Sequence, residues 1–164
     1  MERLLGWEAM QDHVVVRRED LEGALAAELI GELNAELSGR YPEEGDQHFR
    51  LDAAEVAPGA GAFVVAYVAD APVGCGAVRR IAAEVGEVKR MYVREAARGR
   101  QVGGRLLAAL EAEARALGIR RLVLETGVRQ PEAQALYRRA GFVVIDAFGE
   151  YVGSPISVCM GKDL

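Results

Sequence analysis

One segment limits the possible folds more than any other part of the chain. An apolar strand pattern ending near Val93 precedes a glycine-rich loop, ARGRQVGGRLL, at residues 97–107. Helically spaced apolar residues follow, and Gly118 marks the helix end as a C-cap residue. These apolar residues are Leu106, Leu107, Leu110, Ala114 and Leu117. The buried-type strand RLVLET comes next, so the segment predicts a β-α-β unit with two parallel strands.

The remaining segments predict a larger mixed sheet around this unit. HVVVRR at residues 13–18 indicates a first strand, and residues 19–37 indicate a helix with Asp20 as its N-cap. Two apolar runs around a turn at Asp70 to Pro72 predict a hairpin, and the strand up to Val93 extends it into an antiparallel meander.

The last third of the chain completes the predicted architecture. PEAQALYRRAGF opens at Pro131 and closes at Gly141, which is typical of a helix, and FVVID and SPISVCMGKDL supply the last two strands. We therefore expect one α/β domain over residues 1–164, with a mixed, mostly antiparallel sheet and helices on both faces.

Composition excludes several classes of protein. The chain has 164 residues and no apolar run near the roughly 20 residues that a membrane span needs. MERLLGWEAMQDH contains acids and is unlike a signal peptide, so we expect a cytoplasmic protein without membrane contact. Cys75 and Cys159 are interpreted as reduced core residues, and they form no metal-ligand spacing with His13 or His48, so no metal is expected.

Charge is distributed unevenly along the chain. The net charge is −5, yet eight basic residues and only three acidic ones lie between Arg79 and Arg105. A basic region in an acidic chain suggests a local anionic ligand. A nucleic-acid binder is one alternative, but the acidic remainder would repel a long polyanion, so we expect no nucleic-acid partner.

The glycine-rich loop indicates a phosphate site. Exposed N–H groups at a helix N-terminus bind anionic oxygens, and the helix dipole adds to this. A P-loop is excluded because Gly99 and Gly104 are followed by Arg105 and Leu106, which leaves no hydroxyl for magnesium. A dinucleotide fingerprint is excluded because Gln101 stands where its second glycine would be.

A third pattern fits these residues. RGRQVGGRLL resembles the [RQ]-x-x-G-x-[GA] loop of the GCN5-related N-acetyltransferases (the GNAT family), with Arg98 first and Gly103 last. EAQALYRRAGF is similar to the A-x-x-LY-x-x-x-GF element of that family, and the resemblance covers nearly the whole chain. It implies an acyl-CoA N-acyltransferase-like fold and direct transfer of an acyl group, most simply acetyl, from coenzyme A to an amine.

The resemblance also implies where acetyl-CoA would bind. The pyrophosphate would lie on backbone N–H groups of the loop, and the thioester arm would pair with the preceding strand. The implied contact residues are Met91, Tyr92, Val93, Arg98, Gly99, Arg100, Gln101, Val102, Gly103, Gly104, Arg105 and Gln130. The side chains of Arg98 and Arg100 either add charge there or are solvated. Gln101 replaces a family glycine, and we expect it to have a negative φ and a side chain turned away from the phosphates. Gln130 replaces a common asparagine, which alters one side-chain contact.

Two residues are candidates for the chemistry. The resemblance makes Tyr137 the general acid that protonates the leaving thiolate, and the alternative is a core aromatic on one helical face. It makes Glu87 the base, and the alternatives are a salt bridge to basic neighbours or a water acting as the base. On a regular strand Glu87, Met91 and Val93 share a face, which a bulge would change.

The acceptor is the least determined part. The first helix, residues 39–61 and the segment FGEYVGSPIS would shape its pocket. Acids at Glu43, Glu44, Asp46 and Asp52 suit a cationic amine, either a small molecule or a peptide, and equally suit a solvated loop. A non-catalytic acyl-CoA sensor remains the alternative function, because it needs the loop but neither Tyr137 nor Glu87. A homodimer through SPISVCMGKDL also stays open.

Overall fold

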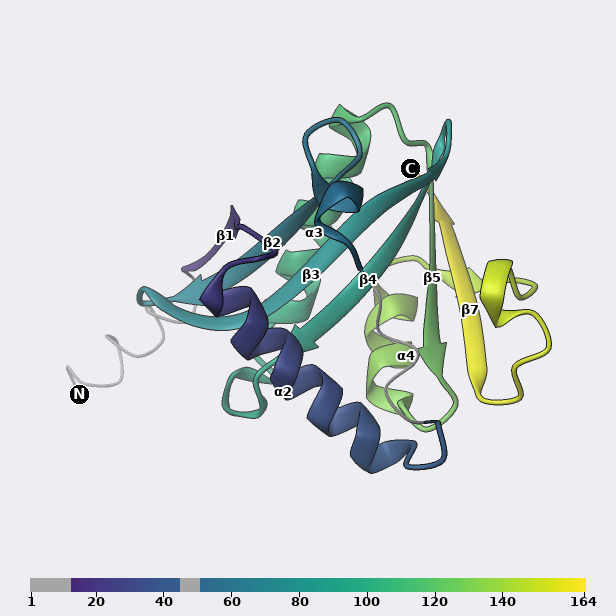
Figure 1. The fold of residues 1–164 in the computed structure, drawn as a ribbon, viewed down its shortest axis with the longest axis horizontal. Coiled ribbons are helices and arrows are strands. Elements are labelled where there is room, and N and C mark those ends of the chain that lie inside the picture. The colour runs from purple at the N-terminus through teal and green to yellow at the C-terminus, as the bar shows by residue number, and fades with distance from the viewer. Residues whose placement is uncertain (1–12, 45–50) are drawn as a thin grey trace.

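A seven-stranded sheet forms the centre of the computed structural model, which describes residues 13–44 and 51–164. Asp46 and His48 lie outside these residues. The strand order is β1-β2-β3-β4-β5-β7-β6 (Figure 1). The strands are β1 (Val14–Arg18), β2 (Gly61–Val68), β3 (Ala71–Ala82), β4 (Val85–Val93), β5 (Arg121–Gly127), β6 (Val143–Val144) and β7 (Ser157–Asp163). Among the described strands only β4 and β5 pair in parallel, which confirms the predicted β-α-β unit in a mostly antiparallel sheet.

The predicted meander is present as β2, β3 and β4. Ala69 and Asp70 form the turn between β2 and β3, with φ values of 49° and 63°. Two residues of positive φ make the tight hairpin turn whose twist matches that of the flanking strands.

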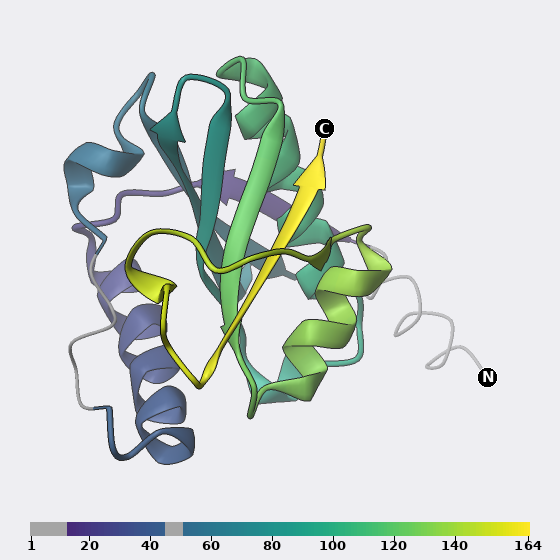
Figure 2. The same ribbon diagram turned by 90° about the vertical axis from the view of Figure 1, so that its right-hand side faces the viewer.

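Helices cover both faces of the sheet, as predicted. The three α-helices in the described chain are α2 (Ala24–Arg40), α3 (Val102–Ala116) and α4 (Pro131–Arg139). In Figure 2, α2 lies on one side of the sheet and α3 and α4 lie on the other. Short 3-10 turns are η2 (Ala53–Val56), η3 (Glu95–Ala97) and η4 (Gly149–Tyr151). None of the described helices is both long and apolar enough to cross a membrane.

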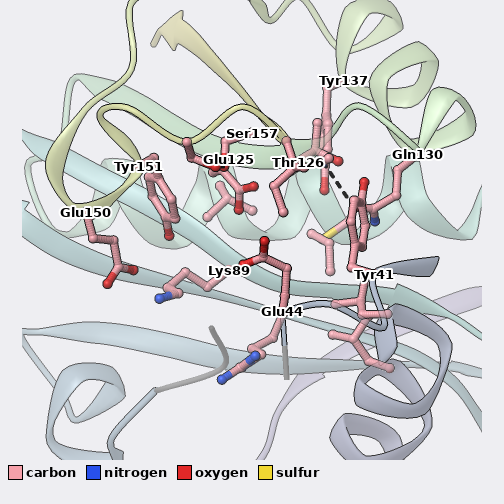
Figure 3. A pocket seen from close by; sticks show the side chains of 18 residues that line it. Tyr41, Glu44, Lys89, Glu125, Thr126, Gln130, Tyr137, Glu150, Tyr151 and Ser157 are labelled. Atoms are coloured by element: carbon pink, nitrogen blue, oxygen red, sulfur yellow. Dashed lines mark hydrogen bonds between the residues drawn. The ribbon is translucent and has the colours of Figure 1, made fainter. Parts of the chain in front are cut away.

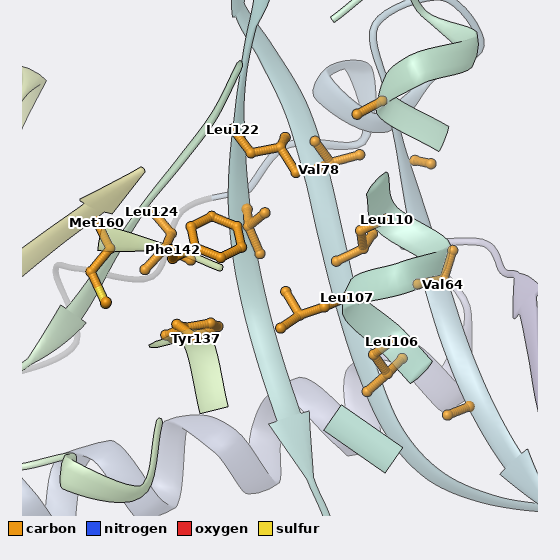
Figure 4. Close-up of a cluster of buried hydrophobic side chains, with 14 of the residues drawn as sticks. Val64, Val78, Leu106, Leu107, Leu110, Leu122, Leu124, Tyr137, Phe142 and Met160 are labelled. Atoms are coloured by element: carbon orange, nitrogen blue, oxygen red, sulfur yellow. The ribbon is translucent and has the colours of Figure 1, made fainter. Parts of the chain in front are cut away.

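The core follows from the alternation of side chains along β2. Phe63 and Val65 pack toward Leu29 of α2, whereas Ala62 and Val64 belong to the cluster under α3. In that second cluster Leu106, Leu107, Leu110 and Phe142 are fully buried or nearly so (Figure 4). Burial of each such side chain contributes about 1.5–3 kcal/mol, so this apolar face of α3 fixes the helix on the sheet.

Two boundary predictions are wrong. The N-cap of α2 is Gly23 and not Asp20, whose carboxylate instead accepts a hydrogen bond from the backbone of Glu22 in the preceding turn. FVVID forms only the two-residue strand β6. Cys75 and Cys159 are buried free thiols, as predicted.

Candidate active site

The site begins where β4 and β5 separate. Residues 85–88 of β4 pair with residues 121–124 of β5, and no further pair joins the two strands among the described residues. Because β4 continues to Val93 and β5 to Gly127, both strands extend past their junction without pairing to each other. The middle of the sheet therefore opens toward the carboxyl ends of these two strands.

A β-bulge re-aims the side chains of β4 at this opening. Cys75 of β3 lies opposite Tyr92, whereas Ala77 lies opposite Lys89, so β4 has one extra residue in this register. Arg90 lies in this bulge and has a φ of 58°. This left-handed conformation costs about 1–2 kcal/mol for a residue with a side chain. The regular alternation that would place Glu87 and Met91 on one face is therefore broken.

A cavity of about 370 Å³ lies in the opening between β4 and β5 (Figure 3). Its walls come from both faces of the sheet and from both diverging strands. The lining residues are Leu33, Leu37, Tyr41, Glu44, Val88, Lys89, Arg90, Met91, Glu125, Thr126, Gly127, Gln130, Tyr137, Glu150, Tyr151, Ser154, Ile156 and Ser157.

Tyr137 reaches this cavity from α4. Its side chain is 6% exposed, and its ring meets the edge of Phe142 with centroids 5.9 Å apart. Burial raises the pKa of the Tyr137 phenol, and the negative charge of Glu125 raises it further. The phenol therefore stays protonated at neutral pH and can donate a proton. The core-aromatic interpretation also holds, because the ring belongs to the cluster under α3.

Glu87 has other partners and does not line the cavity. Its carboxylate is 1% exposed. Arg79 donates to Oε1 at 2.9 Å, and the hydroxyl of Tyr151 donates to Oε2 at 2.8 Å. The salt bridge that was the alternative interpretation is thus present, and a catalytic role for Glu87 stays a prediction.

Glu125 is a cavity residue that the sequence reasoning missed. It is the first residue of β5 after the last pair with β4, and its negative charge contributes to the raised pKa values of Tyr41, Tyr137 and Tyr151. Glu125 lines the same cavity as all three tyrosines. The only signal in the sequence was a single acid at the end of the apolar run RLVLET.

The N-terminus of α3 offers unused backbone donors. The N–H of Arg105 makes the first intrahelical bond, to the carbonyl of Gln101 at 3.1 Å, so the preceding N–H groups have no helical acceptor. No side chain caps this end. Around Gly104 there is open space, whereas a Cβ on Gly103 would come within 2.8 Å of Leu136, so Gly103 lets α3 pack on α4. This end of α3 suits a pyrophosphate group.

Gln101 corrects one expectation. It has φ 63° and ψ 14°, which is left-handed, and not the negative φ that we expected. Gly99, between η3 and α3, also has a positive φ, of 77°. These two residues turn the chain between η3 and the start of α3. The family glycine at this position has a physical reason, because glycine adopts this conformation without strain. The Gln101 side chain is exposed.

Arg98, just before the loop, contacts two neighbouring elements. Arg98 donates to the carbonyl of Val93 at 2.9 Å and to the carboxylate of Glu36 on α2 at 2.7 Å. Arg100, in the turn before Gln101, is half-buried. Arg98 thus links the end of β4 to α2, whatever charge it offers to a ligand.

Gln130 is used inside the protein. Its side-chain oxygen accepts a hydrogen bond from the backbone N–H of Gly127 at 3.0 Å, at the start of α4. A contact between this side chain and a cofactor stays a prediction. Within residues 13–44 and 51–164, no cluster of His, Cys, Asp and Glu is arranged to hold a metal ion.

Known proteins are similar to this chain in sequence and in fold. The family model described as Acetyltransferase (GNAT) family matches residues 26–142. An "IAA acetyltransferase" of Azospirillum brasilense is 43% identical over 94% of this chain and 100% of its own. A Klebsiella pneumoniae structure assigned to the acyl-CoA N-acyltransferases is 34% identical, covers 92% of this chain and 97% of that one, and has a TM-score of 0.80.

A further structure shares the fold alone. It is a GNAT acetyltransferase of Elizabethkingia anophelis with acetyl-CoA bound, 18% identical, with a TM-score of 0.67 over 93% of this chain and 99% of that one. The family match covers most of the chain, and the 43% identical relative is matched over its full length. This chain therefore belongs to the GNAT acetyltransferase family and is an acetyl-CoA-dependent N-acetyltransferase.

Proposed function

We propose that acetyl transfer takes place in the opening between β4 and β5, with acetyl-CoA and the amine meeting at Tyr137. The observation that carries this proposal is the separation of the two strands beside the uncapped N-terminus of α3. Acetyl-CoA then binds with its pyrophosphate on the N–H groups of Val102, Gly103 and Gly104. Its pantetheine arm pairs with the free edge of β4 as an added strand would.

The transfer needs a polarised carbonyl and a proton for the leaving group. A backbone N–H of residues 91–93 donates to the thioester oxygen and stabilises its developing charge. The amine nitrogen attacks the carbonyl carbon, the carbon–sulfur bond breaks, and the thiolate takes the phenol proton of Tyr137. The raised pKa of Tyr137 keeps the phenol protonated, so its O–H is available to the thiolate as it forms.

The amine must lose a proton before it attacks, and two carboxylates are candidates for accepting it. Glu125 lines the cavity, whereas Glu87 does not, and its two oxygens accept hydrogen bonds from Arg79 and from the cavity residue Tyr151. We favour Glu125 as the acceptor of this proton, directly or through water, and keep Glu87 as the competing candidate. A Glu125→Gln variant that retains full activity at every pH would exclude Glu125.

The acceptor is an amine on a small molecule or a peptide. The Azospirillum brasilense relative is named an IAA acetyltransferase, so IAA belongs in the first panel of acceptors. Spermidine, tyramine, L-glutamate and a lysine-containing tripeptide complete the panel, because they separate cationic, aromatic, acidic and peptidic acceptors.

Two measurements test this function. Isothermal titration calorimetry should detect acetyl-CoA binding, and no binding at millimolar ligand would exclude the proposed cofactor site. Thiol release across the panel then identifies the class of amine that is acetylated. Tyr137→Phe should lower kcat by about 100-fold and leave acetyl-CoA affinity unchanged. Tyr67→Phe is the matched control, because Tyr67 bonds Glu19 away from the cavity.

We also retain a homodimer through the last strands as a proposal. Val143 and Val144 of the edge strand β6 are 64% and 60% exposed, which supports a contact between copies at this edge. Sedimentation velocity of the protein decides it, and a single monomeric species at high micromolar concentration would exclude the dimer.

A further inference from the structure

The segment between β6 and β7 forms one end of the cavity. Residues 145–156 are irregular apart from η4, and they supply the lining residues Glu150, Tyr151, Ser154 and Ile156. Long irregular connections of this kind in a compact domain often shape a binding site. In Figure 2 this segment starts beside α4 and crosses the strands to the α2 side of the sheet, where η4 lies.

Tyr151 and Tyr137 enter the cavity from opposite walls (Figure 3). Tyr137 comes from α4, which packs against the N-terminal end of α3 through Leu136 and Gly103. The pyrophosphate end of the cofactor therefore belongs to the wall of Tyr137. The acceptor then binds against the opposite wall, which Tyr151 forms.

The hydroxyl of Tyr151 is fixed by a buried carboxylate. It donates to Oε2 of Glu87 at 2.8 Å, and Phe148 packs its ring edge-on against Tyr151 with centroids 5.2 Å apart. Burial raises the pKa of the Tyr151 phenol, and the charge of Glu87 raises it further, so the phenol remains a donor.

Glu87 is itself fixed from the other side. Arg79 contacts Oε1 through Nε at 2.9 Å and through a terminal nitrogen at 2.8 Å, and it also pairs with Glu55 of η2. A buried charge is tolerated when it is paired and its lone pairs are satisfied, and Glu87 meets both conditions. The chain of contacts Glu55–Arg79–Glu87–Tyr151 thus connects η2, the sheet and η4.

We propose that Glu87 is a positioning residue for the acceptor: held by Arg79, it fixes Tyr151 as the acceptor-side wall, and Tyr151 determines which amines fit. This inference rests on the function proposed above, because it takes the wall opposite Tyr137 as the acceptor's. It assigns Glu87 no proton transfer. Removing either end of the Glu87–Tyr151 contact should weaken acceptor binding and leave the cofactor side intact.

Steady-state kinetics of Glu87→Gln and Tyr151→Phe test this role, with the panel amine of highest kcat/KM as the probe. Each variant should raise KM for that amine by about tenfold, the factor lost with one hydrogen bond to a charged group. The values of kcat, the pH–rate profile and the acetyl-CoA affinity should stay near those of the wild type. The double variant should be no worse than either single one, because both remove the same contact. Glu84→Gln, at an exposed carboxylate paired with Arg120, is the matched control.

Two kinetic outcomes would overturn the proposal. If Glu87→Gln loses kcat by 100-fold or more together with the acidic limb of its pH–rate profile, while Tyr151→Phe behaves normally, Glu87 is the base. If Tyr151→Phe leaves KM unchanged for every panel amine, Tyr151 does not select the acceptor.

Hydrogen exchange gives a readout that needs no acceptor. Amides of residues 149–157 should exchange faster in both Glu87→Gln and Tyr151→Phe, and unchanged exchange would refute the anchoring. If no panel amine is acetylated, the proposed function fails while this measurement still decides the anchoring. Tyr151→Phe also covers the case in which the buried Glu87→Gln change prevents folding.

Discussion

Replacing Gln101 with glycine should stabilise this protein. Gln101 has φ 63° at the N-cap of α3, and a left-handed residue with a Cβ costs about 1–2 kcal/mol. Glycine removes that strain but adds about 0.4–1 kcal/mol of conformational entropy to the unfolded chain. The side chain of Gln101 is exposed and does not cap the helix, so little else is lost. The net gain is about 0.5–1 kcal/mol.

For a chain of this length, a gain of that size corresponds to a rise in Tm of about 1–4 °C. Thermal denaturation followed by circular dichroism measures it. Ala96→Gly is the matched control: Ala96 is exposed in the adjacent η3 turn and has no positive φ, so this change should lower Tm. Gln101→Ala should leave Tm nearly unchanged, because it keeps the strain. A fall in Tm for Gln101→Gly similar to that of Ala96→Gly would refute the left-handed assignment.

Three further predictions concern packing and charge. Gly127→Ala should destabilise by about 1–3 kcal/mol, because its Cβ would lie 1.7 Å from the hydroxyl of Tyr41, and chemical denaturation measures this loss. Gly104→Ala, where the Cβ meets open space, should stabilise α3 by up to about 1 kcal/mol in the same assay, and a loss there would contradict the open space. The Arg94 hydrogen bond lowers the pKa of Glu32 from 4.5, so its contribution is present above that pH and is lost as the pH falls further. Arg94→Gln should therefore flatten the acid side of a Tm-against-pH curve, and an unchanged slope would contradict the pairing.

Regular elements were predictable because side-chain periodicity reports burial. The spacing of Leu106, Leu107 and Leu110 indicated α3, and these residues are buried against the sheet. The parallel pairing of β4 with β5 followed from the helix between them. These elements depend on local pattern and chain connectivity, which a single sequence contains.

The details of the site were not predictable in the same way. Arg90 and Gln101 are left-handed because strand register and chain reversal require it, and neither residue type signals that conformation. Glu125 carried no spacing pattern, and only the separation of β4 from β5 brings it into the cavity. The partners of Glu87 come from β3 and from η4, 64 residues further along the chain.

The short junction between β4 and β5 also has a mechanical consequence. Four residue pairs join a part of the sheet that contains β1–β4 to a part that contains β5–β7. A small rotation of one part against the other changes the width of the opening most at the end far from the junction. Tyr137 belongs to one part and Met91 to the other, so their separation depends on that rotation. Packing at Val88 and Leu124, in the last pair before the strands part, therefore affects how far Tyr137 lies from Met91.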